Sequence, residues 1–137
     1  MFYEILALTG DSQVTNLVIL QAKLRSRYQQ HKSAPDLIEF ISEKQLIIKW
    51  TNFQFTIYKN TESYVLEESQ DIARNFPQYP KIAKCDRRLE VSSDEDRQME
   101  HFNDYIFIQE TIEHLGRVFL YEPQTGQLYR SQSYANN

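Results

Sequence analysis

The densest group of side chains capable of chemistry lies between residues 100 and 114. His101 and Asp104 are three positions apart, so on a helix they share one face. Glu110 and His114 are four positions apart and meet the same condition. A histidine beside a carboxylate can act as a general base or supply two ligands to a divalent cation. These four residues are therefore the candidate catalytic residues.

The spacing of the two histidines limits this chemistry. His101 and His114 are thirteen positions apart, which places them about 140° apart around a helix and about 20 Å apart along its axis. The two pairs therefore cannot bind one metal ion, and the sequence identifies no third ligand for either pair. We predict no metal and no cofactor. Polar pairs on a solvated helix face are the alternative to a site.

A second group of residues suits contact with a partner. Lys23 and Arg27 are four positions apart with Tyr28 beside them, and Tyr121 and Tyr129 lie near the C-terminal end. Tyrosine has a large apolar body and one hydroxyl, and it is enriched where protein surfaces meet. We predict that these five residues bind a partner. The alternatives are cations that complement the dipole of a helix C-terminus and tyrosines that seal the margins of the core.

Composition and charge narrow the class of protein. The 137 residues are 41% hydrophobic and 25% charged, which is typical of one soluble globular domain. The net charge of -4 repels phosphate backbones, so nucleic-acid binding is disfavoured. A single cysteine, Cys85, cannot form an internal disulfide, and its position predicts a buried side chain. With no signal peptide and no apolar run of about 18 residues, we expect a cytoplasmic protein without a membrane span.

The first half of the chain predicts a strand, two helices and a hairpin. Residues 2–8 are rich in strand formers, and apolar residues then recur at helical spacing over residues 12–30. A proline near its start favours a short second helix over residues 33–41, with a strand as the alternative. β-Branched and aromatic runs at 46–50 and 53–58 are separated by two residues, so they predict a tight antiparallel hairpin.

The middle of the chain leaves one alternative open. Residues 64–66 predict a third strand, followed by a short helix over 68–76. One longer helix from Thr61 is the alternative. Apolar and charged residues alternate over residues 82–91, which predicts a strand with one charged face.

The last third of the chain predicts the longest helix and a second hairpin. Ser92 and Glu95 have the spacing of a capping box for a helix near residues 93–115. Two strand-like runs within residues 118–129 flank a turn with proline and glycine, which predicts a C-terminal hairpin. Residues 131–137 are polar, and we expect a frayed tail there.

These elements predict a single α+β domain over residues 1–137, with a mainly antiparallel sheet and about three to four helices. The function that follows is a small non-catalytic binding or regulatory module that acts through protein contact. Self-association through an edge strand is a variant of this function. The alternative is a small ligand- or metal-binding enzyme that uses the carboxylates and histidines of the long helix.

Overall fold

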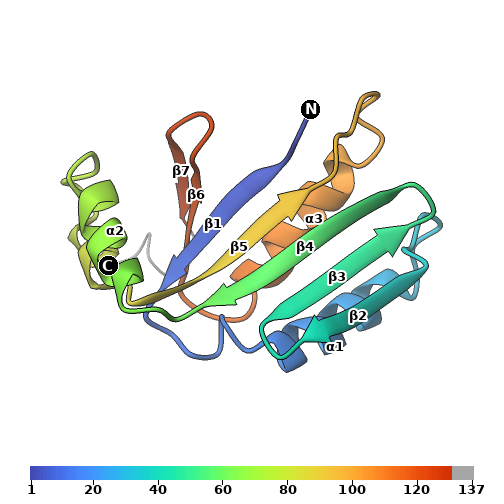
Figure 1. Cartoon of the computed structure of the whole chain (residues 1–137), viewed down its shortest axis with the longest axis horizontal. Helices are drawn as coiled ribbons and strands as arrows, with labels where there is room; N and C mark the ends of the chain where they lie inside the picture. The colour runs from blue at the N-terminus through green and yellow to red at the C-terminus, as the bar shows by residue number, and fades with distance from the viewer. Residues whose placement is uncertain (131–137) are drawn as a thin grey trace.

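One antiparallel sheet of seven strands organises residues 1–130, which are the residues that the computed structural model describes (Figure 1). The strand order is β2-β3-β4-β5-β1-β6-β7. The strands are β1 (Glu4–Thr9), β2 (Leu37–Ser42), β3 (Gln45–Trp50), β4 (Phe53–Asn60), β5 (Arg87–Ser93), β6 (Phe119–Glu122) and β7 (Gln127–Arg130). The helices are α1 (Leu17–Tyr28), α2 (Tyr64–Ala73), the 3-10 helix η1 (Pro80–Lys84) and α3 (Phe102–Glu113).

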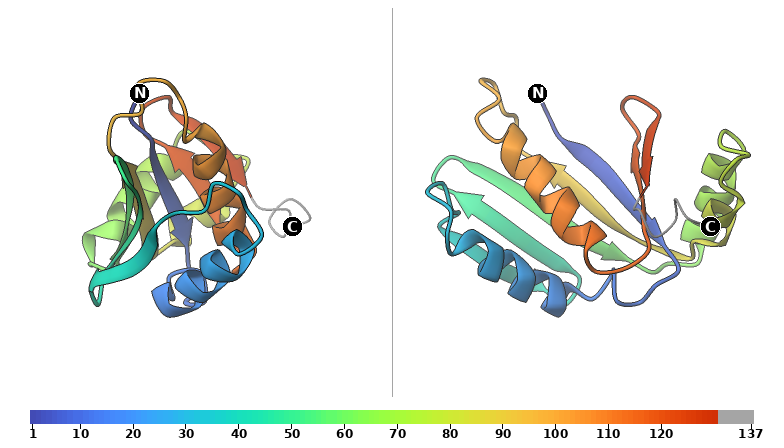
Figure 2. Two further views of the ribbon diagram at one scale, coloured as in Figure 1. Left: turned by 90° about the vertical axis from the view of Figure 1, so that its right-hand side faces the viewer. Right: turned by 180° about the vertical axis from the view of Figure 1, so that it is seen from behind.

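The two longest helices cover one face of the sheet. Figure 2 shows α1 and α3 side by side in front of the strands when the molecule is seen from behind. The main core lies between them and the inward side chains of the strands, and its fully buried members include Leu24, Phe55, Leu89 and Ile108. Side chains along a strand alternate between the two faces of a sheet, so the polar residues next to the buried strand residues lie on the other face.

A smaller core lies at the end of the sheet near α2. Leu8, Ile82, Cys85 and Phe119 are its buried members, and they join β1 and β6 to η1. Beyond α2 and η1, the face of the sheet turned to the viewer in Figure 1 has no helix over β3, β4 and β5 within residues 1–130. We call this surface the bare face.

The predicted fold class and both predicted hairpins are confirmed. Over residues 1–130 the sheet is antiparallel throughout, and three α-helices accompany it. β3 and β4 pair across the Thr51 and Asn52 turn, with Trp50 opposite Phe53. β6 and β7 pair around a turn in which Gly126 adopts a φ of 71°, a left-handed conformation that favours glycine. Residues 131–137, where we expected a frayed tail, lie outside the described residues.

The predicted helix over residues 33–41 is wrong, because Leu37–Ser42 forms β2. The proline favours a helix start through local backbone geometry alone. The strand is stabilised instead by its pairing with β3, where Ile38 lies opposite Ile48. The predicted strand at 64–66 is also wrong. Helix α2 begins at Tyr64, close to the alternative of one longer helix from Thr61.

Two predicted elements are shorter than expected. The strand expected over 82–91 begins at Arg87, and η1 occupies the residues before it. The helix expected over 93–115 covers only Phe102–Glu113, so Ser92 and Glu95 do not cap it. Ser93 instead stays in β5, where its Oγ accepts a hydrogen bond of 2.9 Å from the backbone N–H of Tyr3.

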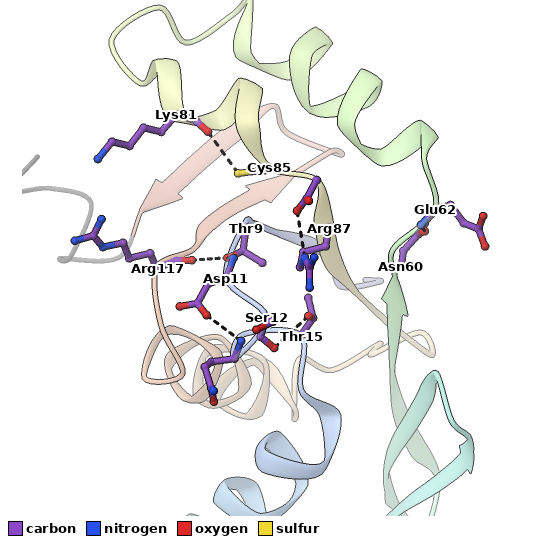
Figure 3. A network of polar contacts seen from close by, with 12 residues as sticks. Thr9, Asp11, Ser12, Thr15, Asn60, Glu62, Lys81, Cys85, Arg87 and Arg117 are labelled. Atoms are coloured by element: carbon purple, nitrogen blue, oxygen red, sulfur yellow. Dashed lines mark hydrogen bonds and ion pairs between the residues drawn. The ribbon is translucent and has the colours of Figure 1, made fainter.

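The first helix is also shorter than the predicted range of 12–30. It begins after Asn16, whose Oδ1 accepts hydrogen bonds of 3.1 Å from the backbone N–H groups of Val18 and Ile19. An asparagine in this position satisfies N–H groups that have no partner within the helix. Asp11 forms a turn before the helix, where its Oδ1 accepts from the N–H of Gln13 (Figure 3).

The edge strand β2 is tied to helix α1 through a backbone carbonyl. The carbonyl oxygen of Ile38 accepts hydrogen bonds of 2.9 Å from Gln21 Nε2 and from Arg25 Nη2. Arg25 also forms an ion pair of 3.2 Å with Glu39. Edge strands with unpaired backbone groups are templates for pairing with another chain. The two α1 side chains therefore protect this edge against strand addition.

We predict that the double variant Gln21→Ala and Arg25→Ala self-associates more strongly than the unmodified protein, because it exposes the Ile38 carbonyl. Sedimentation at several concentrations will measure the weight-average mass. Lys23→Ala with Ser26→Ala is the matched control, because both residues are exposed on the same helix. Equal masses for the two double variants would contradict the protective role.

Candidate functional site

The structure brings the first predicted pair of catalytic residues together. His101 precedes α3, and its Nδ1 lies 3.0 Å from Asp104 Oδ2. The hydroxyl of Tyr28 on α1 donates a hydrogen bond of 2.8 Å to Asp104 Oδ1. The imidazole of His101 stacks on the Phe53 ring with a centroid separation of 4.2 Å and an interplanar angle of 7°. The orientation of His101 is therefore determined by a carboxylate and by an aromatic ring.

A buried carboxylate that we did not predict from the sequence positions this histidine. Asp96 is 4% exposed, and its side chain accepts hydrogen bonds from the Tyr3 hydroxyl (2.6 Å) and from the backbone N–H groups of Glu100 (3.0 Å) and His101 (2.9 Å). Burial opposes the charge of Asp96, but these hydrogen bonds outweigh it and hold the pKa below its usual value. The loop before α3 is thereby fixed to the first strand.

Backbone geometry in the same loop supports this reading of Asp96. Met99 has a φ of 56°, which is uncommon for a residue other than glycine. Such a conformation persists where the surroundings determine it, and here Asp96 binds the backbone N–H groups of the two residues that follow Met99.

His101 lines a hollow of about 530 Å³ between the β3–β4 turn and the loop that precedes α3. Trp50, Asn52, Asp96 and Glu100 are among the other residues that line it. We call it the His101 hollow. A histidine held by a carboxylate beside a hollow can accept or donate a proton to a bound molecule. Within residues 1–130, no group of three or more His, Cys, Asp or Glu side chains is placed to hold a metal ion.

The side chains of the second predicted pair, Glu110 and His114, do not contact each other as those of His101 and Asp104 do. Glu110 Oε2 faces α1 and lies 4.0 Å from Arg27 Nη2. His114 is exposed and follows the end of α3, where its backbone N–H donates to the carbonyl groups of Glu110 and Thr111. The structure thus places His101 with Asp104, while Glu110 contacts a different helix.

The predicted partner-binding residues lie in two parts of the structure, helix α1 and the β6–β7 hairpin. Tyr28 is 3% exposed and donates its hydroxyl to Asp104, so it is a core residue. Arg27 lies 4.1 Å over the Phe107 ring and donates a hydrogen bond to Thr111 Oγ1, which joins α1 to α3. Lys23 is exposed on α1.

The two C-terminal tyrosines of that group lie on β6 and β7. Tyr121 is half-buried and packs edge-on against Phe76 at a centroid separation of 6.2 Å. Tyr129 is 45% exposed, and its hydroxyl donates a hydrogen bond of 2.6 Å to Gln127 Oε1. Of the two rings, Tyr129 offers the larger surface to a partner.

Cys85 is buried, as predicted. Its side chain is packed in the smaller core, and Sγ lies 3.7 Å from the carbonyl oxygen of Lys81 (Figure 3). Burial, with a further contribution from the charge of Asp86, raises the pKa of the Cys85 thiol to about 12. The thiol is therefore protonated at neutral pH and is a packing group.

The bare face carries a second hollow, which no predicted motif indicated. It has a volume of about 570 Å³ and lies on β1, β4 and β5, with the start of β3 and the β6–β7 turn at its margin. We call it the sheet-face hollow, and the residues that define it are Glu4, Leu6, Thr56, Tyr58, Glu90 and Pro123. The pairing register explains the grouping, because Tyr58, Glu90 and Leu6 lie directly opposite one another on β4, β5 and β1.

A buried arginine connects the sheet-face hollow to α2. Arg88 is 6% exposed; its Nε donates a hydrogen bond of 2.7 Å to Glu90 Oε2, and its Nη1 forms an ion pair of 2.8 Å with Glu68 Oε1. Asn60 Nδ2 donates to Glu90 Oε2 (2.8 Å) and to the Tyr64 hydroxyl (2.7 Å). Burial lowers the pKa of Arg88, but the two carboxylates outweigh burial and raise it.

Comparison of the chain with models of protein families, with curated proteins and with solved structures finds no match. None of the helices within residues 1–130 has the length and apolar character needed to cross a membrane.

The depressed pKa of Asp96 predicts a pH dependence of stability. A carboxyl group whose pKa is lower in the folded state stabilises the fold above its unfolded value of about 3.9. That contribution is lost as the pH falls through the folded value. We expect Asp96→Asn to lower the free energy of unfolding at pH 7. We also expect the free energy of unfolding of this variant to fall less than that of the unmodified protein between about pH 5 and pH 2. Urea unfolding at several pH values tests this, with the exposed Asp94→Asn as the control. Parallel pH profiles for the unmodified protein and Asp96→Asn would contradict the role of Asp96.

Proposed function

We propose that the protein is a non-catalytic binding module whose partner protein docks on the bare face. One observation carries this proposal: α1 and α3 cover one face of the sheet, and within residues 1–130 no helix lies over β3, β4 and β5 on the other face (Figures 1 and 2). The sheet-face hollow lies on that other face. Ligand and partner sites are concave surfaces with a few placed polar groups. The sheet-face hollow combines concavity with Tyr58, Glu4 and Glu90.

The chemistry of the bare face supports protein contact. Apolar side chains alternate there with polar ones: Leu6 and Ile47 are half-buried, and Ser92 and Lys49 are exposed. Protein interfaces of the non-obligate kind have such mixed polarity. The net charge of -4 disfavours nucleic acid as the partner. We place the protein in the cytoplasm, and we include self-association through the β7 edge as a variant, since α1 protects the β2 edge.

A second candidate function is ligand binding or catalysis at the His101 hollow. The observation that favours it is the His101 and Asp104 pair, whose geometry is fixed by Phe53, Tyr28 and Asp96. A preorganised histidine of this kind is suited to acid–base chemistry.

The docking proposal predicts a loss of partner capture when the bare face is filled. In the double variant Thr56→Tyr and Ser92→Tyr, two bulky uncharged rings replace small side chains, and tyrosine is well tolerated in strands. We expect this variant to lose one stoichiometric protein that the unmodified bait captures from lysate of the source organism after cross-linking. Ala22→Tyr with Ser26→Tyr, on the exposed surface of α1, is the matched control and should retain it.

Mass spectrometry of the cross-linked material identifies the captured protein. The docking proposal fails if both double variants capture the same proteins, or if the unmodified bait captures none. Matched circular dichroism spectra of the three baits will establish that the two tyrosine variants are folded.

The second candidate function predicts a ligand-dependent shift in thermal unfolding. A metabolite or divalent metal that binds the folded state at 100 times its Kd stabilises it by about 2.7 kcal/mol. We expect any such shift to disappear in His101→Ala and to persist in His114→Ala, because His114 is exposed beyond the end of α3. A panel in which no compound raises the Tm, or in which His101→Ala keeps the shift, would exclude the second candidate.

A further inference from the structure

We propose that the sheet-face hollow receives a lysine or arginine side chain from the partner protein. This inference rests on the proposed docking function and names the chemistry of the occupant. It follows from the charges around the hollow, from the ring that lines it and from the apolar surface at its centre.

The charges around the hollow leave an excess of carboxylate. Glu4 and Glu90 line it from neighbouring strands, and Glu4 is exposed. Glu4 lies opposite Ser92 and Leu6 lies opposite Glu90, so the two glutamates are diagonal neighbours. Such neighbours are about 7–8 Å apart at the backbone, a separation that one cation can bridge with its methylene stem lying between them.

The positive charge that lines the hollow is already neutralised. Arg88 lines the hollow, but its guanidinium is paired with both Glu90 and Glu68. Among the side chains that line the hollow, Glu4, Glu90 and Arg88 sum to a net charge of -1, and the exposed Glu4 takes no part in the ion pairs of Arg88. An excess of negative charge at a hollow favours a cationic group from a partner.

The remaining walls suit the stem and the head of a basic side chain. Tyr58 lies opposite Glu90 on the neighbouring strand, and both residues line the hollow. The faces of aromatic rings attract ammonium and guanidinium groups. Leu6 and Pro123 provide apolar surface, against which the methylene groups of lysine or arginine pack. The combination of carboxylate, ring and apolar surface selects a long basic side chain over an acidic or purely apolar one.

The overall charge of the chain acts in the same direction. Its net charge of -4 attracts a basic partner over the distance at which electrostatic steering operates. This attraction weakens with salt, so binding through the hollow should weaken as well.

The experiment is an NMR titration of the ¹⁵N-labelled full chain at low salt with acetyl-hexalysine amide, and separately with acetyl-hexaglutamate amide. We expect saturable shift changes with hexalysine at the backbone amides of the residues that line the hollow, and none there with hexaglutamate. Glu4→Gln should weaken hexalysine binding about threefold, the effect of one partly exposed ion pair. Glu43→Gln removes one exposed carboxylate in the β2–β3 turn and should leave the affinity unchanged.

Three results would overturn the inference. They are shift changes spread evenly over the acidic surface, equal affinities for the Glu4→Gln and Glu43→Gln variants, and equal binding of hexaglutamate at the hollow. These failures are distinct from a failure of the docking proposal. A partner that is lost in the Thr56→Tyr and Ser92→Tyr bait, but contacts the bare face through a neutral or acidic segment, would leave docking intact and refute the basic anchor.

Discussion

The position of β5 between β4 and β1 is the constraint on which the rest of the structure depends. Leu89 and Val91 of β5 face α1 and α3 and are at most 1% exposed, while Arg88 and Glu90 face the opposite side. Because side chains alternate with a period of two, a slip of one residue would exchange the two sets. Two charges would then lie in the main core. The apolar core thus determines the register, and the register determines which charges meet on the bare face.

The ion pairs of Arg88 stabilise this register further, and they influence the charge of the bare face. A buried charge costs free energy unless it is paired, and removing one partner from such a pair typically destabilises a protein by about 3 kcal/mol or more. Glu90 pairs with Arg88 from the same strand, and Glu68 pairs with it from α2. The arginine is therefore used to hold α2 against the sheet. At the sheet-face hollow, the exposed carboxylate of Glu4 lies outside these ion pairs, so the network that stabilises the fold leaves one carboxylate accessible on its surface.

Features that depend on neighbouring residues were predictable from the sequence, and features that depend on distant ones were not. The β3–β4 hairpin and the pair His101 and Asp104 follow from spacings of a few residues. The helix expected over residues 33–41 failed because β2 is stabilised by its pairing with β3 and by α1 side chains. The start of α3 was misplaced because Asp96 binds Tyr3, which is 93 positions away. The sheet-face hollow combines residues of four strands, so no single motif indicates it.

The candidate surfaces differ in their polar groups. Some polar groups form hydrogen bonds within the fold, and others stay accessible at the surface. The hydroxyls of Tyr3, Tyr28 and Tyr105 donate to Asp96, Asp104 and Glu122, and burial followed by these carboxylates raises the pKa of each tyrosine. The Tyr28 contact joins α1 to α3, the Tyr105 contact joins α3 to β6, and the Tyr3 contact joins the start of the chain to the loop before α3. The three rings lie in the core on the helix-covered side. Tyr58 instead lines the sheet-face hollow beside carboxylates. The tyrosines therefore divide into rings that build the core and a ring that lines the hollow of the bare face, and for a strand residue the face of the sheet on which it falls decides between the two positions.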